Sequence, residues 1–406
     1  MNSPPSSGAA SSAAAVGGVF THPLLEPNPN GSNTLKAFGN IFIAIVGAGV
    51  LGLPYIFMKA GWLTSLILIF SVASLSYRCM MLLILTRRHL QNNNPNNTNL
   101  NSFGDLGFAI CGSSGRFAVD IMIVLTQSSF CIGYLIFISN TLKSTNYIWG
   151  LFPFQLGLNA IPSLTHLAPL SIFADLVQII AMTDVIVNDV MVLSNGVNLP
   201  IENAIGGLST FVYGLGVAMY SFEGAAMALP LEFEMKDKRK FSKVLAITIG
   251  LVSLLYGLFG IMSYFAFGAE TRDIITTNMG NGITSIMIRL GLCVNLFFTL
   301  PLMMNPVYEV LERRFWNGEY CLWIRFLLVM LICLAASYIP NFSDFLSFVG
   351  SSICCVLGFV LPALFHYLAF KDEMDWRGAL ADATIVVLGI TVCITGTWSS
   401  LSRSFS

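Results

Sequence analysis

Long apolar runs separated by short polar segments dominate the chain from residue 37 onward. An α-helix needs about 20 apolar residues, within a range of roughly 17 to 25, to cross the hydrocarbon core of a bilayer. Ten runs reach or nearly reach this length, so the pattern predicts a bundle of membrane-spanning helices. The ten predicted spans are Ala37–Met58, Leu63–Thr86, Phe117–Leu142, Leu170–Leu193, Leu208–Leu231, Val244–Phe267, Ile283–Leu311, Leu322–Tyr338, Phe342–Phe370 and Ala379–Trp398.

One further apolar run, Tyr147–Ile161, is short for a span, and the positive charges decide how it is interpreted. Cytoplasmic loops of membrane proteins collect Lys and Arg. If this run crosses, Arg87, Arg88 and the basic cluster of residues 236–243 share one side of the membrane; if it does not, the cluster lies opposite the two arginines. The charge pattern therefore favours eleven spans, with a cytoplasmic amino terminus and a carboxyl terminus on the lumenal or extracellular side.

The composition agrees with lipid as the main solvent of this chain. Of its 406 residues, 55% are hydrophobic and only 10% are charged, whereas about 25% of the residues of a soluble domain are charged. The balance of 20 Lys and Arg against 21 Asp and Glu argues against nucleic acid as a partner, because phosphate binding needs a basic face. The nine cysteines show no metal-ligand spacing, so we expect neither a metal site nor a cofactor.

The spans divide the chain into a tail and one large domain. Residues 1–33 are rich in Ser, Ala, Pro, Gly and Asn, which predicts a disordered cytoplasmic tail. Residues 34–406 form the predicted membrane domain, with spans one to five over about 37–193, spans six to ten over about 208–370, and span eleven over about 379–398. Because five is odd, a second five-span unit is inverted in the membrane, and inverted repeats are typical of carriers.

Span one contains a helix-breaking sequence. Gly47, Gly49, Gly52 and Pro54 fall within eight residues, and each Gly weakens a helix by about 1 kcal/mol and Pro by about 3 kcal/mol. A membrane tolerates such backbone only where protein or an aqueous cavity satisfies it. Close helix packing through small residues is the alternative explanation, and span one alone does not decide between them.

The first helix of the second unit, span six, carries its own interruption at Tyr220–Gly224. Interruptions at matching positions of two halves are the best sequence pointer to a transporter's binding site, so the pair favours substrate binding over packing. The predicted substrate-binding residues are Val46, Gly47, Ala48, Gly49, Val50, Tyr220, Ser221, Phe222 and Gly224.

Glu223 is the most informative side chain of the second interruption. An acidic residue at mid-membrane costs about 2.5 to 3.5 kcal/mol, so it usually faces a cavity and has a partner. Burial disfavours its charged form, which suggests a residue that binds and releases a proton during transport. Alternatively, Glu223 is a tether that bridges amides or hydroxyls of spans one and six without titrating.

Other polar residues of the spans are less informative. Asn305 of span eight could line the central cavity, although a satisfied contact with a neighbouring helix explains it as well. We assign no role to five further charged residues, which are Arg78, Asp120, Asp175, Asp184 and Arg289.

The two interruptions also suggest the kind of substrate. A broken helix presents amides at the start of its second half and carbonyls at the end of its first half. A carboxylate suits the amides of Gly49 and Val50, and an ammonium suits the carbonyls around Val46 and Ser221. Because neither interruption contains Lys or Arg, a zwitterion with a small uncharged side chain fits better than a net anion.

Four stretches closely resemble the amino acid/auxin permease family, and within it the plant vacuolar neutral amino acid transporters. They are NIFIAIVGAGVLGLPYIF from Asn40, YSFEGAAMALPLEFEMKDK from Tyr220, LFFTLPLMMNPVYEVLERRF from Leu296 and SFVGSSICCVLGFVLPALFH from Ser347. The resemblance covers the chain from about Thr34 to the carboxyl terminus. It implies the five-plus-five inverted fold of the amino acid/polyamine/organocation superfamily, a neutral amino acid as substrate, proton coupling and the vacuolar membrane, with the plasma membrane as the alternative. We also expect a monomer.

Three other functions remain as alternatives at this stage. An enzyme would need clustered catalytic groups, and no two of the four histidines are close in sequence, so we expect a non-enzyme. An ion channel or an amino acid sensor could use the same fold. Sodium could also replace the proton as the coupling ion, because the same carbonyls could coordinate it.

Overall fold

The computed structural model describes residues 33–93, 100, 102–161, 168–195, 204–280 and 282–404. Every regular element in this part of the chain is a helix. The predicted tail, residues 1–33, lies outside the described residues except for Asn33. The α-helices are α1 (Thr34–Ile45), α2 (Leu53–Ala60), α3 (Trp62–Asn93), α4 (Phe103–Leu142), α5 (Asn146–Asn159), α6 (Ala168–Ser194), α7 (Leu208–Ser221), α8 (Ala225–Glu234), α9 (Phe241–Phe267), α10 (Ile283–Phe315), α11 (Leu322–Tyr338), α12 (Phe342–Val349), α13 (Leu361–Phe370) and α14 (Trp376–Ser404).

Eight helical stretches of the described chain are long and apolar enough to cross a membrane. A ninth candidate is the pair α1 and α2, which bends by 49° at a short break. The multi-pass helical membrane fold is thus confirmed. Two of the eleven predicted spans correspond to shorter helices, because α11 has 17 residues and α5 has 14 with Pro153 inside. The count of eleven spans therefore stays a prediction.

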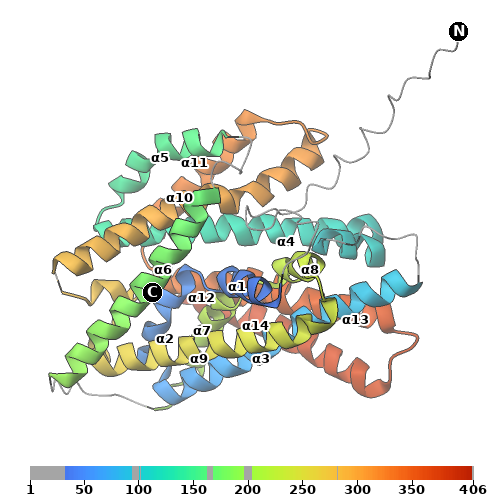
Figure 1. Cartoon of the computed structure of the whole chain (residues 1–406), viewed down its shortest axis with the longest axis horizontal. Coiled ribbons are helices and arrows are strands. Elements are labelled where there is room, and N and C mark those ends of the chain that lie inside the picture. The colour runs from blue at the N-terminus through green and yellow to red at the C-terminus, as the bar shows by residue number, and fades with distance from the viewer. Residues whose placement is uncertain are drawn as a thin grey trace, which may run out of the picture.

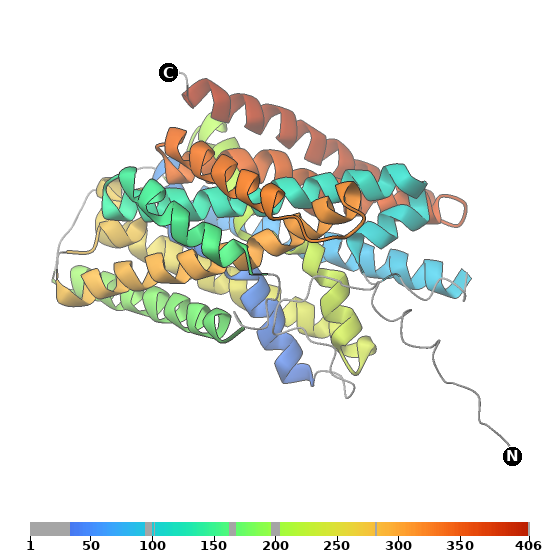
Figure 2. The ribbon, with the colours of Figure 1, turned by 90° about the horizontal axis from the view of Figure 1, so that it is seen from above.

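The helices pack side by side in one bundle (Figures 1 and 2). Helix α9 packs against α1, α2, α3 and α6, and α10 packs against α4 and α6. Helices α1 and α8 lie beside each other; Figure 1 shows both nearly end-on, while α3, α4 and α9 run across the view. The two half-length helices thus leave the bundle together on one side, as Figure 2 shows.

Helix α4 begins 14 residues before the predicted span Phe117–Leu142, at Phe103. Gly112 has φ 62° and ψ −148° inside it, so the helix folds sharply at this residue. The positive φ suits glycine, which has no Cβ to clash in this conformation. A Cβ on Gly107 would lie 2.8 Å from the Gly115 carbonyl oxygen, so the two arms touch backbone to backbone.

Ion pairs join the helix ends. Arg87 and Arg88 of α3 both pair with Glu232 of α8, at 2.6 and 2.7 Å. Glu312 of α10 pairs with Arg325 of α11 at 2.8 Å. Buried charges are stable only when they are paired and hydrogen-bonded, so these contacts fix which helix ends meet.

Two of the charged residues without an assigned role also have partners. Asp120 of α4 pairs with Arg313 of α10 at 3.1 Å. Arg289 donates to the carbonyl oxygens of Met279 and Gly280, at 3.3 and 2.7 Å. Both arginines thereby connect α10 to neighbouring segments. The side chain of Asp175 lies outside the described residues.

Candidate functional site

The first predicted interruption is present between α1 and α2. Helix α1 ends at Ile45, Val46 and Gly47 are extended, and a 3-10 turn, Ala48–Gly52, leads into α2. Pro54 stands in the first turn of α2, where a helix leaves N–H groups without a partner and the fixed φ of proline suits the start of a helix. The sequence therefore ends one half-helix and starts another within the span.

The second interruption is also present. Helix α7 ends at Ser221, and α8 begins at Ala225 after Gly224 as its N-cap. The Phe222 amide donates to Ala218 and the Glu223 amide to Tyr220, at 3.1 and 3.3 Å. These two bonds close α7, so α8 begins as a separate helix after the break.

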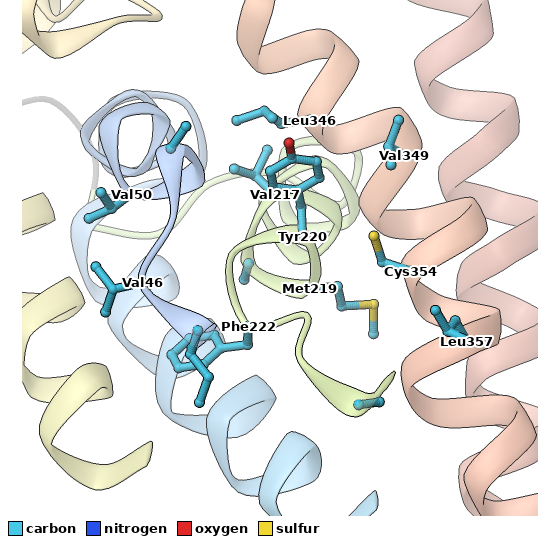
Figure 3. Packing of buried hydrophobic residues seen from close by; sticks show 14 of the residues in the cluster. Val46, Val50, Val217, Met219, Tyr220, Phe222, Leu346, Val349, Cys354 and Leu357 are labelled. Atoms are coloured by element: carbon cyan, nitrogen blue, oxygen red, sulfur yellow. The ribbon is translucent and has the colours of Figure 1, made fainter. Parts of the chain in front are cut away.

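The two interruptions lie against each other (Figure 3). A Cβ on Gly49 would lie 3.0 Å from the Ser221 hydroxyl oxygen and 3.0 Å from the Tyr220 ring. A side chain at this position would press on both residues, so glycine suits the approach. Gly49 is therefore the residue that lets the first unwound segment contact the second.

Tyr256 of α9 forms hydrogen bonds to both interruptions. Its buried hydroxyl donates to the Ile45 carbonyl at 3.1 Å and, more weakly, to the Ser221 carbonyl at 3.4 Å. These carbonyls end α1 and α7, where the partial negative charges of both helix dipoles gather. One phenol proton thus stabilises two negative helix ends.

A cavity of about 160 Å³ lies beside the two interruptions. It is smaller than the roughly 300 to 1,000 Å³ of sites for drug-sized ligands, so it suits a ligand of amino acid size. Helices α4, α6 and α10 form the facing wall, whose side chains include Gln127, Phe130, Gln178, Asn295, Thr299 and Met303.

Most predicted binding residues line this cavity. Those that do are Val46, Gly47, Ala48, Gly49, Tyr220, Ser221 and Gly224, together with Glu223. Val50 and Phe222 do not: they are 0% and 1% exposed, and the Phe222 ring packs against Tyr256 with a centroid separation of 5.1 Å. Their side chains point away from the cavity because residues close together on a turn face different directions.

The Val50 amide is also less free than the sequence suggests. It donates to the Gly47 carbonyl at 3.4 Å within the 3-10 turn. Gly49 and Ala48 precede it at the start of that turn, where N–H groups have no partner within the helix. The amides available to a carboxylate are therefore shifted toward the start of the turn.

The carboxyl group of Glu223 is half-buried and faces the cavity. One oxygen, Oε1, accepts from the Ala225 amide at 3.2 Å. The other, Oε2, faces Gly358 in a π-helical turn, Val356–Val360, where a Cβ would approach it to 2.7 Å. No cationic side chain of the described residues forms an ion pair with Glu223. A carboxyl group held this way can exchange a proton with the cavity.

Asn305 does not line the cavity, whereas Asn295 and Thr299 of the same helix do. Six residues separate Thr299 from Asn305, which places Asn305 roughly 9 Å further along α10 and about a third of a turn around it. The Thr299 hydroxyl donates to the Asn295 carbonyl at 2.9 Å. The polar face of α10 thus lies earlier in the helix than Asn305.

Sequence reasoning missed Gln127, Gln178, Asn295 and Tyr256. Each is a neutral polar residue inside an apolar run, a signal that is present but does not say which partner the residue meets. Apart from Glu223 and the tyrosines 134 and 220, the cavity lining contains no ionisable residue. Within the described residues, no group of three or more His, Cys, Asp or Glu could hold a metal ion.

The chain is similar to known transporters over nearly its full length. The family model described as transmembrane amino acid transporter protein matches residues 30–402. The amino acid transporter AVT3C of Arabidopsis thaliana is 55% identical over 95% of this chain and 94% of its own length. The amino acid transporter ANT1 of the same plant is 35% identical over 95% and 98%.

More distant similarities extend to a fungal protein and to a solved structure. The vacuolar amino acid transporter 3 of Schizosaccharomyces pombe is 26% identical over 86% of this chain and 55% of its own. The structure of Mhp1, a nucleobase-cation-symport-1 family transporter, superposes with a TM-score of 0.54 at 13% identity over 95% and 94%. At this identity the second similarity concerns the fold alone.

Proposed function

The chain belongs to the transmembrane amino acid transporter family, and from this premise we propose that it carries neutral amino acids across the vacuolar membrane in a proton-coupled, alternating-access cycle. Two relatives that are 55% identical to this chain are named as amino acid transporters. Two fungal relatives are named as vacuolar transporters, which supports the membrane that we propose.

The observation that carries this proposal is the small cavity between two broken helices. Its lining contains no Lys, Arg or His, so a ligand with a balanced charge fits it. The substrate carboxylate faces the amides of Ala48 and Gly49. The ammonium faces the carbonyl ends of α1 and α7, because each carbonyl oxygen has two lone pairs and Tyr256 takes up only one of them.

We further propose that residues 34–406 form one transporter domain with eleven spans. Spans one to five and six to ten are inverted copies, and span eleven is appended. In support, each predicted span coincides with helix in the described residues, and the first span of each copy is the broken one. The amino terminus is cytoplasmic in this arrangement, and the protein acts as a monomer.

Glu223 is the proposed proton site, while the seven predicted binding residues that line the cavity hold the substrate through backbone and side chain. The cavity extends along α1 from Asn40 and along α8 to Leu231. At the other end, Phe137 packs on Phe342 with 5.7 Å between ring centroids. We propose that the described conformation is open toward the side from which α1 and α8 project, which is the cytoplasm in the proposed orientation.

Flux through purified protein in proteoliposomes tests the proposed function. Radiolabelled Ala and Pro are supplied under an imposed pH gradient without sodium, and we expect saturable, gradient-driven accumulation. In Glu223→Gln, accumulation against a gradient should be lost while exchange of substrate for substrate continues, because Gln cannot take up and release the proton. Glu234→Gln, at the end of α8 and outside the cavity lining, is the matched control.

The outcomes separate the alternatives. Absence of flux under every gradient refutes the carrier, and large ionic currents identify a channel. Binding of an amino acid without flux identifies a sensor. Accumulation that needs sodium, or that Glu223→Gln retains, refutes proton coupling through Glu223.

A further inference from the structure

Two glutamines on the wall opposite the broken helices have polar atoms without a partner. Gln127 of α4 and Gln178 of α6 line the cavity, and Gln178 is only 5% exposed. Neither the oxygen Oε1 of Gln127 nor the nitrogen Nε2 of Gln178 has a hydrogen-bond partner among the described residues. Of the buried, unpartnered side-chain atoms in this part of the chain, only these two belong to residues that line the cavity.

The fold satisfies other polar side chains in the same region. Ser221 donates to the Val217 carbonyl at 2.9 Å, and Thr299 donates to the Asn295 carbonyl at 2.9 Å. Gln155 of α5 is fully buried, yet its amide donates to the Phe297 carbonyl at 2.8 Å and its oxygen accepts from Asn159 at 3.2 Å. Buried polar groups are normally paired. The unpaired atoms of Gln127 and Gln178 are therefore unusual among the side chains that line the cavity, and a bound ligand could pair with them.

We propose that Gln127 and Gln178 form a subsite for the substrate side chain, and that this subsite selects neutral amino acids with a hydroxyl or carboxamide over apolar ones of the same shape. This inference rests on the proposed function, because the two broken helices are taken to hold the backbone of the substrate. The two glutamines face them from other helices, which leaves the side chain between.

The chemistry of the two groups defines the ligand. A carboxamide is neutral and offers both donors and acceptors, so the pair does not compensate a charged side chain. A hydroxyl or carboxamide on the substrate supplies both a donor and an acceptor. A methyl group supplies neither and leaves both glutamines desolvated and unpaired, and a site built for a hydrogen bond rejects such an analogue.

Thr and Val are the sharpest probes, because they have the same shape and differ by a hydroxyl in place of a methyl. We expect wild-type proteoliposomes to transport Thr with a kcat/KM about tenfold above that for Val, which corresponds to one or two net hydrogen bonds. Gln127→Leu and Gln178→Leu should each lower this ratio, and the double variant should bring it near one, because Thr then loses both partners.

Thermal unfolding shows whether Gln127 and Gln178 select the substrate or stabilise the fold. Removing an unpartnered buried polar atom should not lower the melting temperature, so we expect both leucine variants to be as stable as the wild type. Gln155→Leu is the matched control, because it removes hydrogen bonds within the fold: it should lower the melting temperature and keep the tenfold ratio.

Two results would overturn the proposal that Gln127 and Gln178 form a subsite. One is a wild-type ratio near one, which would mean that water satisfies both glutamines whichever substrate is bound. The other is a tenfold ratio that survives both leucine substitutions. If the wild type carries no neutral amino acid at all, the proposed function fails first, and Ala flux in the same vesicles identifies that case.

Discussion

Glu223 depends on the absence of a side chain at Gly358. Its Oε1 is held by the Ala225 amide, and its Oε2 occupies the space that a Cβ on Gly358 would enter, at 2.7 Å. A contact this short does not occur, so any larger residue at this position must displace the carboxyl group. Gly358 lies in a π-helical turn, and such turns often mark functional sites.

Gly358→Ala should therefore impair transport without weakening the fold. We expect uphill uptake to fall by about tenfold or more, because the displaced carboxyl group loses the geometry that transfers its proton. Ala in place of Gly stabilises a helix by about 0.5 to 1 kcal/mol, so the melting temperature should not drop. Uptake in proteoliposomes and thermal unfolding measure the two effects.

Gly250→Ala in α9 is the control for that substitution, because a Cβ there meets nothing within 4 Å. It should leave uptake unchanged. Normal uptake by Gly358→Ala would show that the position of the Glu223 carboxyl group is not critical.

At the same scale, sequence predicts some site residues and not others. Glu223 is identifiable because a carboxyl group is rare at mid-membrane. Gln127 and Gln178 are not, because Gln155 has the same composition signal and is satisfied by the fold. Val50 and Phe222 belong to the right segments, but the directions of their side chains depend on the exact unwinding of each break.

Among the elements, α9 joins the two broken helices. Among the described residues of α9, only Tyr256 forms hydrogen bonds to the ends of both α1 and α7. Loss of its hydroxyl leaves two buried carbonyls without this donor, and each such loss costs about 1 to 3 kcal/mol. The two half-helices would then move independently.

Tyr256→Phe should lower both stability and substrate affinity. We expect a melting temperature below that of the wild type and a KM for Ala that rises several-fold, because the binding amides lose their fixed spacing. Tyr77→Phe removes a hydroxyl that bonds Ser242 at 3.0 Å between α3 and α9, away from the site. It should lower the melting temperature alone, and an unchanged KM in Tyr256→Phe would contradict the role of Tyr256.

The ion pairs between α3 and α8 anchor the second half of span six. Glu232 is completely buried against Arg87 and Arg88. Glu232→Gln should destabilise the protein by about 3 to 5 kcal/mol, because it leaves a buried guanidinium without its partner. Equilibrium unfolding measures this loss.

A second substitution tests the pairing itself. The double variant Glu232→Gln with Arg87→Gln should lose less stability than the sum of the single variants, since the pair is removed together. Losses that simply add would show that the two side chains are not coupled.

For the whole molecule, apolar run length predicts where helices lie, and the described chain is helical in each predicted span. Helix pairing is less accessible to sequence, because α1 and α8 meet although about 180 residues separate them. Sequence locates the two breaks through Gly and Pro, whose backbone preferences are local. It does not locate the wall of α4, α6 and α10, because tertiary packing decides which faces of those helices point inward.

The most direct test of the central claim is a density map of the protein in lipid nanodiscs with saturating L-alanine. The account predicts ligand density bounded by Gly47–Gly49 on one side and Tyr220–Glu223 on the other, with both helices unwound there. Ligand density at another position, or an unbroken helix through either segment, would contradict it.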